Sequence, residues 1–430
     1  SFSKQDPMPE ILEPERAPHL LRPGMTVFVE GASGEPTALL DALAAAPAAS
    51  DGVHYVGCRV PGVNLVDPAS FHASATLTTF FVFGDIARSY QAGKVRFLPL
   101  HYSSIFAYLA TLPVDIALIQ VTPPDAQGLC SLGPSVHFVP AVLDRAKLVV
   151  AEINAAMPRP VQTYLVPYER LDFVVDTAHP LVQLETGAPS EQARTIGEQV
   201  AGLLEDGDCI QIGIGKLPAS VLAALHGHRN LGLHGGMVTD EVVDLHAAGA
   251  LTGARKSHDP HSMVCCTALG RRVYDWAASR NDLRFAPVGY THDVRVLAQI
   301  DRFVAINSVL AVDLSGQANA EMLHGRQVSG TGGLLDFVRG ARLARGGRSI
   351  LALPSTAGGA SRIVPRLDEE NHVVSLPRAD ADIVVTEHGV ARLRDRSLDE
   401  RAQALIAIAD PTVRDRLANA WDALRSKGAL

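Results

Sequence analysis

The sequence has little of several features that would assign a function at once. Only 5 of its 430 residues are cysteine, 5% are aromatic, and no apolar run reaches the roughly 18 residues that cross a bilayer. An odd number of irregularly spaced cysteines indicates reduced thiols rather than a disulfide framework. The N-terminal stretch "SFSKQDPMPE" lacks the basic and apolar segments of a signal peptide. We therefore expect a cytoplasmic protein with no membrane partner.

The chain is also poor in concentrated positive charge. It has 38 Lys and Arg against 46 Asp and Glu, a formal net charge of -8, and no block of basic residues. This composition argues against nucleic acid as a partner. What the sequence does contain is 47% hydrophobic and 20% charged residues, which is typical of a folded α/β protein, and enough length for two domains.

Two segments of the chain resemble each other. "GMTVFVEGASGEPTALLDAL" (24–43) and "GDCIQIGIGKLPASVLAAL" (207–225) each begin with glycine and a short β-branched strand. A glycine-containing turn follows, and then a proline suited to the first turn of a helix. In both segments apolar residues stand three, four and seven positions after the proline, on one face of a helix. The similarity predicts two related strand-turn-helix units, each opening an α/β domain.

A segment rich in proline, glycine and polar residues, 179–192, separates these two units. We predict an N-terminal α/β domain over 1–188 and a C-terminal α/β domain over 189–430. Continuous apolar runs, such as "VDIALIQV" and "RSILALP", are typical of parallel strands that are buried on both faces. The expected fold class is α/β, with two tandem open, mostly parallel sheets and helices on both faces.

Two glycine-rich segments are candidates for binding a ligand. "SGTGGLLDFVRGA" (329–341) places Gly330, Gly332 and Gly333 before a helix, where backbone N–H groups favour an anion or oxyanion. A tight turn without a ligand explains the same pattern equally well. "GIGKLP" has Pro218 where a dinucleotide fingerprint needs its third glycine. Lys216 in that turn is either a phosphate ligand or a solvated side chain.

Cysteine and histidine offer weaker candidates. Cys130 lies in a rigid loop after a strand and is a possible nucleophile, but no histidine is close in sequence and a buried structural thiol is commoner. His258 and His261 stand near Cys265 and Cys266, but their spacing fits no zinc pattern. We expect no metal.

Many segments in register resemble the acetyl-CoA hydrolase/transferase family, the branch of CoA-transferases that includes 4-hydroxybutyrate and acetate CoA-transferases. The resemblance covers nearly the whole chain and is carried by "VDIALIQVTPPDAQGLCSLGPSV", "AEINAAMPR", "FVAINSVLAVDLSGQANAE", "GRQVSGTGGLLDFVRGA", "ALPSTAGGASRIVP" and "PRADADIVVTEHGVARLR". It implies a class I CoA-transferase-like fold and a homodimer or larger assembly. The implied ligands are coenzyme A, as substrate or acyl-CoA, and a small carboxylic acid or other acceptor.

The resemblance also implies a ping-pong mechanism. In that mechanism a Glu carboxylate attacks the acyl-CoA carbonyl and forms an anhydride, and then an enzyme-CoA thioester. By family position Gly332 and Gly333 lie in an oxyanion-binding loop, and Gly330 with the following helix lies against CoA. Asn307 falls beside the reacting thioester. We expect CoA against residues 329–337, in a cleft between the two halves; Arg88 and Arg159 are candidates for the acceptor carboxylate by family position only.

The family's nucleophile is missing from its expected place. The family motif resembles Leu-Gly-Ile-His-Thr-Glu-Met, whereas this chain has "LGLHGGM", so Gly236 stands at the Glu position and Gly235 at the preceding one. His234 keeps the register. Glu241 lies five residues further on, about 16 Å along an extended chain, and needs a different backbone path to take that place. A glycine at 236 also permits a left-handed backbone, in which a larger residue would be strained by about 1–3 kcal/mol.

Three functions remain open. In the first, the protein processes an acyl-CoA thioester without an enzyme anhydride, by hydrolysis or direct acyl transfer, and His234 is either a general base or structural. In the second, it is a non-catalytic CoA or acyl-CoA binder, or a partner subunit. In the third, it is an ordinary CoA-transferase that uses a relocated carboxylate such as Glu241. The intact glycine loop and Asn307 favour an enzyme, while two adjacent glycines at the reaction centre argue against one.

Overall fold

The computed structural model describes residues 8–367 and 373–428, so the start of the N-terminal stretch considered above lies outside it. The described chain forms two compact units. Unit 1 comprises the residues up to Glu185 together with Val264–Thr291, and unit 2 comprises Thr186–Met263 together with the residues from His292 onward. The first division falls close to the predicted boundary at 188/189, which as a domain boundary stays a prediction. No pattern in the sequence had indicated that 264–291 belongs with unit 1.

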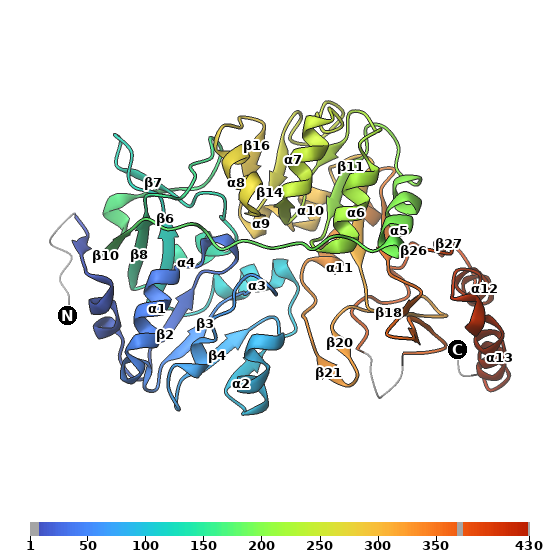
Figure 1. The fold of residues 1–430 in the computed structure, drawn as a ribbon, viewed down its shortest axis with the longest axis horizontal. Helices are drawn as coiled ribbons and strands as arrows, with labels where there is room; N and C mark the ends of the chain where they lie inside the picture. The colour runs from blue at the N-terminus through green and yellow to red at the C-terminus, as the bar shows by residue number, and fades with distance from the viewer. Residues whose placement is uncertain (1–7, 368–372, 429–430) are drawn as a thin grey trace. The chain divides into compact units, whose positions relative to one another are not determined.

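Unit 1 is built on an eight-stranded parallel sheet. Its strands lie in the order β1 (Glu10–Ile11), β10 (Phe173–Thr177), β8 (Leu148–Asn154), β6 (Ile116–Val121), β2 (Thr26–Val29), β3 (His54–Val56), β4 (Thr76–Thr79) and β5 (Val95–Phe97). The chain runs from β2 outward to β5 and then returns to the other side of β2 with β6 (Figure 1). The topological switch point therefore lies between β2 and β6. Ligand sites of open α/β sheets form at the carboxyl ends of strands at such a point.

Unit 2 repeats this plan with a six-stranded sheet. Its strands lie in the order β12 (Gly232–Leu233), β11 (Cys209–Ile212), β17 (Phe303–Ser308), β22 (Arg348–Ala352), β26 (Ile383–Thr386) and β27 (Gly389–Arg392). Every neighbouring pair is parallel except β26 and β27. The chain passes from β11 to β12 and later returns to the other side of β11 with β17, so this switch point lies between β11 and β17. The predicted α/β class with mostly parallel sheets is confirmed.

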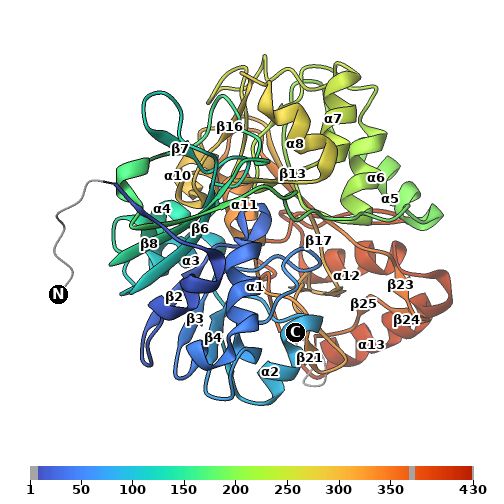
Figure 2. The same ribbon diagram turned by 60° about the vertical axis from the view of Figure 1, so that its left-hand side comes forward.

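Helices accompany both sheets. Those of unit 1 are α1 (Thr37–Ala45), α2 (Ala87–Gln91), α3 (Tyr102–Leu109), α4 (Val139–Leu143), α8 (Arg271–Ala278) and α9 (Val288–Thr291). Those of unit 2 are α5 (Glu191–Ala201), α6 (Lys216–Ala224), α7 (Asp240–Ala247), α10 (Val294–Leu297), α11 (Leu334–Leu343), α12 (Leu398–Ala407) and α13 (Arg414–Ser426). Within unit 2, α5 packs on α6, α11 packs on β17 and β22, and α12 lies beside α13 (Figures 1 and 2).

Short strands complete the two units. They are β7 (Leu129–Ser131), β9 (Leu165–Pro167), β13 (Met237–Thr239), β14 (Met263–Cys265), β15 (Thr267–Leu269), β16 (Leu283–Phe285), β18 (Ala311–Asp313), β19 (Ala318–Asn319), β20 (Met322–Leu323), β21 (Arg326–Gln327), β23 (Thr356–Ala357), β24 (Ala360–Ser361) and β25 (Ile363–Val364).

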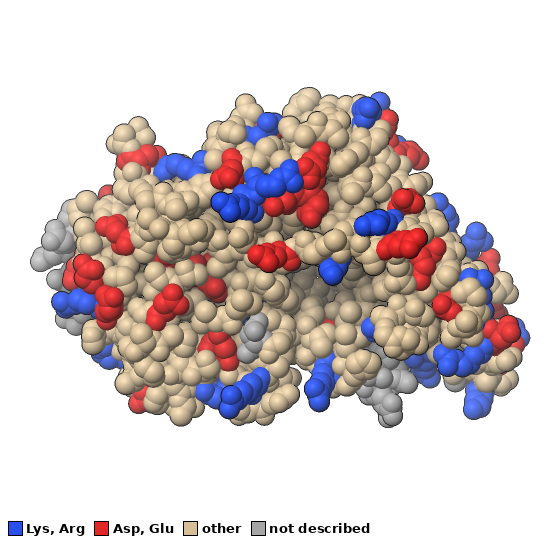
Figure 3. All heavy atoms as spheres, viewed as in Figure 1, with Lys and Arg blue, Asp and Glu red and all other residues tan. Residues whose placement is uncertain are grey.

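On the face drawn in Figure 3, acidic and basic side chains are interspersed. Within the described residues, no helix is long and apolar enough to cross a bilayer.

The two similar segments in the sequence form corresponding parts of the two units. The first becomes β2 and α1, and the second becomes β11 and α6, so each supplies the strand beside the switch point and the helix that follows. The helical positions predicted to face the core are all 0–1% exposed: Leu39, Leu40, Leu43, Val221, Leu222 and Leu225. The burial of these apolar stripes against their sheets explains why the same pattern folds in the same way twice.

Candidate active site

Two amide side chains meet at the switch point of unit 2. Gln211 on β11 and Asn307 on β17 come from adjacent parallel strands. The Asn307 Nδ2 donates to Gln211 Oε1 at 3.0 Å, and the Gln211 Nε2 donates to Asn307 Oδ1 at 3.3 Å. Each amide therefore holds the other at the carboxyl edge of the sheet. The sequence had pointed to Asn307; its partner Gln211 was missed, although a lone polar residue in the apolar strand "CIQI" is a signal that could have found it.

The segment His234–Gly236 leaves the sheet beside this amide pair. β12 ends at Leu233, and the His234 N–H still donates to the carbonyl of Ile210 on β11 at 3.0 Å. A β-carbon placed on Gly235 would lie 3.5 Å from Cγ of Gln211, which is ordinary contact. The His234 ring itself is fully buried and packs edge-on to Phe303 with ring centres 6.4 Å apart. This packing favours the structural role for His234.

The imidazole of His292 occupies the space beside Gly236. A β-carbon on Gly236 would lie 3.2 Å from Cε1 and 3.3 Å from Nε2 of His292. A β-carbon on Gly333 would lie 2.6 Å from Cδ2 and from Nε2 of the same ring. The ring is tilted against Phe337 with centres 4.4 Å apart, and His292 is 1% exposed. Sequence reasoning missed His292, because "YTHDV" matches no motif and shows no periodicity.

The backbone at the two adjacent glycines is ordinary. Positive φ occurs at other glycines, such as Gly332 at 56° and Gly215 at 109°, but not at Gly235 or Gly236. An L-residue at either position is therefore compatible with the backbone. The strain that was expected for a larger residue at 236 does not arise from φ, and only the contact with the His292 ring opposes one.

The predicted glycine loop leads into α11. Gly330 is buried, Gly332 has the positive φ that glycine tolerates without cost, and Gly333 is the residue that caps the helix. Among the residues that the structure describes, no hydrogen bond uses the backbone N–H of Gly332 or Gly333. Both donors lie at the positive end of the α11 dipole, where an anion or an oxyanion is stabilised.

Two other predicted residues lie at the starts of helices. Glu241 is in the first turn of α7, and its Oε2 accepts a hydrogen bond from the Thr239 hydroxyl at 2.5 Å. Lys216 is the first residue of α6 and is exposed. A β-carbon on Gly187 would lie 3.2 Å from its Cε, so the lysine side chain lies along the segment that precedes α5. The roles assigned to Glu241 and Lys216 stay predictions.

The two candidate arginines belong to unit 1. Arg159 is held by its own unit, since its Nη2 is 2.6 Å from Asp125 Oδ2 and its Nη1 donates to the Leu129 carbonyl at 3.0 Å. Arg88 lies exposed in α2. The geometry of unit 1 by itself therefore leaves Arg88 the freer of the two guanidinium groups.

The cysteines and the suspected zinc pattern can be placed as well. Cys130 is buried, and burial raises the pKa of its thiol to about 11, so a thiolate nucleophile is disfavoured at neutral pH. Burial likewise raises the pKa of Cys266 to about 12. Within the described ranges, no group of three or more His, Cys, Asp or Glu side chains is arranged to hold a metal ion. Nε2 of His258 lies 3.9 Å from Oδ2 of Asp259.

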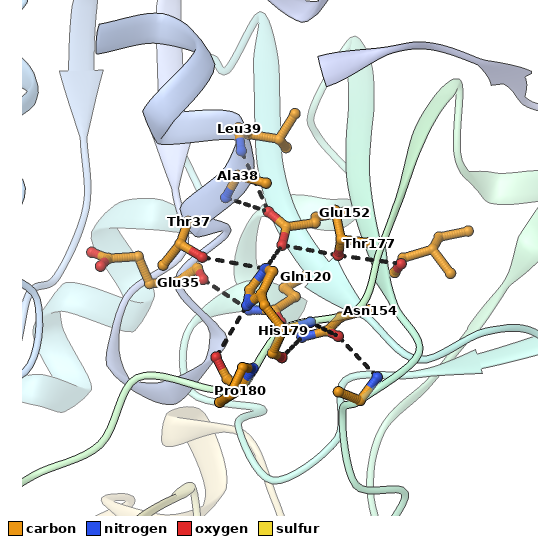
Figure 4. Close-up of polar contacts among 12 residues, drawn as sticks. Glu35, Thr37, Ala38, Leu39, Gln120, Glu152, Asn154, Thr177, His179 and Pro180 are labelled. Carbon is orange, nitrogen blue, oxygen red and sulfur yellow. Dashed lines mark hydrogen bonds and ion pairs between the residues drawn. The ribbon is translucent and has the colours of Figure 1, made fainter. Parts of the chain in front are cut away.

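Unit 1 has a carboxylate network at the corresponding edge of its sheet (Figure 4). Glu152 on β8 is fully buried, and its Oε2 accepts hydrogen bonds from the N–H groups of Ala38 at 3.0 Å and Leu39 at 3.4 Å in the first turn of α1. Its Oε1 accepts from the Thr177 hydroxyl at 3.2 Å and is paired with His179. The Glu152 carboxylate thus accepts hydrogen bonds from two N–H groups in the first turn of α1, which have no acceptor within the helix.

The same network reaches the switch point between β2 and β6. Asn154 Nδ2 donates to Gln120 Oε1 at 2.7 Å, and Gln120 Nε2 donates to the Glu35 carbonyl at 2.8 Å. Burial is the largest influence on His179 and lowers its pKa, but hydrogen bonds to the Pro180 carbonyl and to Glu152 raise the pKa above its usual value overall. These hydrogen bonds all join residues of unit 1.

Two further carboxyl groups at this switch point are buried. Glu30, directly after β2, is 1% exposed and accepts the N–H of Gln120 at 3.0 Å, and burial raises its pKa well above the usual range. Burial also raises the pKa of Glu35 to about 7, against the opposing influence of the Arg59 guanidinium and the Asn64 amide. Both carboxyl groups therefore have polar or charged neighbours within unit 1.

Known proteins resemble this chain over most of its length. The N-terminal domain of acetyl-CoA hydrolase/transferase matches residues 3–183, and the C-terminal domain matches residues 270–421. The 4-hydroxybutyrate coenzyme A transferase of Clostridium kluyveri is 35% identical over 420 residues, which cover 95% of this chain and 96% of that protein. An acetyl-CoA hydrolase of Eremothecium gossypii is 26% identical over 387 residues, covering 75% of this chain and 70% of that protein. The crystal structure of RipA from Yersinia pestis aligns with a TM-score of 0.90 at 31% identity and covers 98% of both chains.

Proposed function

Because the chain belongs to the acetyl-CoA hydrolase/transferase family, we propose that it acts on an acyl-CoA thioester and cleaves it without an enzyme anhydride. Water, or an acceptor bound in its place, attacks the acyl carbon directly. One observation supports this proposal above the others. The position that the family resemblance assigns to the nucleophile is Gly236, and an imidazole ring lies where a side chain at that position would project.

The remaining features of unit 2 suit a thioester. The unused N–H groups of Gly332 and Gly333 can stabilise the negative charge that develops on the carbonyl oxygen. A single donor of this kind is worth about 100- to 1,000-fold in kcat in other acyl-transfer enzymes. The bare backbone of Gly235 and Gly236 lies beside the Gln211 side chain and the His292 ring, which would both contact an acyl group placed there. Positioning and charge stabilisation are then sufficient for direct attack.

A relocated carboxylate is less well supported. The carboxylate of Glu241 accepts a hydrogen bond from Thr239 in the first turn of its own helix, a place where a negative charge stabilises the helix. A Glu241 nucleophile would have to give up this hydrogen bond and leave the helix start. Direct attack requires no such rearrangement.

Binding and turnover measured together test the proposal. The native protein is titrated calorimetrically with acetyl-, butyryl- and 4-hydroxybutyryl-CoA, and the release of CoA thiol is followed with and without added acetate. We expect at least one ester to bind and to release thiol in the absence of acetate. No binding to any CoA ester would exclude every function considered for the chain. Binding without thiol release would identify an acyl-CoA binder, and thiol exchange that requires acetate and a protein adduct would identify an ordinary transferase.

A further inference from the structure

We infer that His292 is the general base of the thioester hydrolysis proposed above, an inference that rests on that proposed function. His292 matches none of the motifs by which the sequence was interpreted. The position of one atom of its side chain supports this role. Nε2 of His292 is close both to the position where a side chain at Gly236 would begin and to Gly333 at the start of α11.

Two distances describe where Nε2 lies relative to the two glycines. Nε2 would lie 3.3 Å from a β-carbon on Gly236 and 2.6 Å from one on Gly333. Side chains at these positions would crowd the ring, and at Gly333 would clash with it, so the glycines are what allow the imidazole to stand there. A nitrogen that can accept a proton thus lies between the proposed site of attack and the proposed oxyanion donors.

The surrounding elements hold the ring in place. His292 is followed by Asp293, whose carboxylate caps α10 by accepting the N–H of Arg295 at 2.8 Å. α10 packs on α11 so closely that a β-carbon on Gly340 would lie 2.5 Å from Cβ of Leu297. The Phe337 ring, also on α11, lies against the imidazole. A general base must lie within hydrogen-bond reach of the proton that it removes, and this packing fixes the position of Nε2.

The step balances as ordinary base-assisted hydrolysis. The unprotonated Nε2 removes a proton from water as the water oxygen bonds to the acyl carbon, and the carbonyl oxygen becomes an oxyanion beside Gly332 and Gly333. When the carbonyl re-forms, the carbon–sulfur bond breaks, and the proton on Nε2 passes to the departing sulfur. The products are the free acid and CoA thiol, and the imidazole returns to its starting state.

The other candidate bases of unit 2 are less suited to this role. The His234 ring is fully buried and packs edge-on to Phe303, and the Glu241 carboxylate is bound to the hydroxyl of Thr239. The atoms nearest to an added β-carbon on Gly236 and on Gly333 belong to neither residue, whereas Nε2 of His292 is near both. The competing explanation for His292 is therefore not another base but simple filling of space between the two glycines.

Replacing the ring without its nitrogens separates these explanations. His292→Phe keeps an aromatic ring between Gly236 and Gly333 but cannot accept a proton, and His226→Phe, at an exposed histidine in the same unit, is the matched control. We expect His292→Phe to lower the rate of thiol release by about 100-fold or more while acyl-CoA affinity changes only a few-fold, and the control to retain the native rate. If His292→Phe keeps half of the native rate, the ring only fills space and the inference is overturned.

A second variant keeps the test decisive if His292→Phe fails to fold. His292→Gly opens a hole that added imidazole can enter, and we expect the restored rate to rise with the pKa of the substituted imidazole, as Brønsted behaviour requires. A restored rate that is the same for imidazoles of different pKa would mean that filling of the hole is sufficient, and would overturn the inference. If the native protein releases no thiol, the proposed function itself is overturned. If the native protein and His292→Phe release thiol equally fast, the proposed function stands and only the role of His292 is overturned.

Discussion

The two units place very different groups at equivalent edges of two similar sheets. In unit 1 the buried Glu152 carboxylate accepts the N–H groups that begin α1. In unit 2 no hydrogen bond among the described residues uses the N–H groups of Gly332 and Gly333, although the Asp336 carboxylate lies in the first turn of α11, and glycines stand at 235 and 236. The start of α1 is therefore occupied by a carboxylate of unit 1, whereas we propose that the start of α11 stabilises the oxyanion of a substrate.

This difference also shows why a buried carboxylate alone does not identify a nucleophile. Glu30, Glu35 and Glu152 are each at most 4% exposed. Each accepts at least one hydrogen bond within unit 1, although Oε1 of Glu30 has no hydrogen-bond partner among the described residues. In unit 2 the corresponding edge offers neutral amides, bare backbone and an imidazole. We therefore propose that the chemistry of unit 2 depends on placing an external acyl group rather than on an internal carboxylate.

The largest expected effect comes from removing the internal anion of unit 1. Glu152→Ala leaves the buried N–H groups of Ala38 and Leu39 without their acceptor, and we expect a loss of about 2–4 kcal/mol in the free energy of unfolding. Glu169→Ala, at an exposed glutamate in the same unit, should change stability by no more than about 0.5 kcal/mol. Denaturant unfolding followed by circular dichroism measures both. Equal stability of the two variants would show that α1 does not depend on the carboxylate.

A slightly smaller effect on stability, but a large one on activity, is expected in unit 2. Gly333→Ala puts a β-carbon 2.6 Å from the His292 ring and 2.8 Å from Phe337, and the ring must move. We expect a loss of about 1–3 kcal/mol in stability and about 100-fold in thiol release. Gly84→Ala in unit 1 is the matched control, because nothing lies within 4 Å of its added β-carbon. Native activity in Gly333→Ala would contradict the placement of the ring at the reaction centre.

A gain of activity should follow from giving unit 2 a carboxylate. We expect the double variant Gly235→Thr, Gly236→Glu to acquire slow CoA transfer between acids, because neither backbone φ is positive and the new threonine meets Gln211 at an ordinary distance. Its hydrolysis should fall by about 10- to 100-fold, since the glutamate displaces His292. Isotope exchange between labelled acetate and acetyl-CoA measures the transfer. The control is the double variant Gly235→Thr, Gly236→Gln, which has no carboxylate at position 236. If it exchanges label as fast as the glutamate variant, the new carboxylate is not the nucleophile.

The smallest expected effect is the pH dependence of the Glu152–His179 pair. A folded pKa above the usual value means that His179 adds stability below about pH 6.5, and that this contribution is lost as pH rises through the folded pKa. The melting temperature of the native protein should exceed that of His179→Gln most at about pH 5.5, by about 2 °C or less, and the gap should close by about pH 8.5. A gap that widens with rising pH would show that the histidine is neutral in the fold.

The parts of the molecule that sequence could predict are those set by local pattern. The strand-turn-helix units follow from periodicity and turn residues, and they lie in the segments where the sequence predicts them. The glycine loop precedes α11 and Asn307 lies near the end of β17, but the roles that resemblance assigns to them stay predictions. Glu152 lay inside a recognised motif, but its role depends on α1, which is more than 100 residues earlier in the chain. A charged residue inside an apolar run signals a buried partner without identifying it.

Sequence could not predict what depends on packing between distant segments. The His292 ring reaches Gly236 and Gly333 only because α10 packs against α11, and no spacing rule connects these three positions. The return of 264–291 to unit 1 is likewise a matter of tertiary contacts. The backbone φ at Gly236 was also beyond sequence, since glycine permits both signs and the actual conformation is set by the strands on either side of it.

The central claim is that unit 2 cleaves a thioester without a carboxylate nucleophile, and mass spectrometry of the reacting native protein tests it most directly. The protein is mixed with acetyl-, butyryl- and 4-hydroxybutyryl-CoA, quenched during turnover, and measured both for released thiol and for its intact mass. We expect released thiol together with an unmodified protein mass. A CoA or acyl adduct on a carboxylate, such as one mapped to the peptide that contains Glu241, would contradict it, and so would the absence of thiol release.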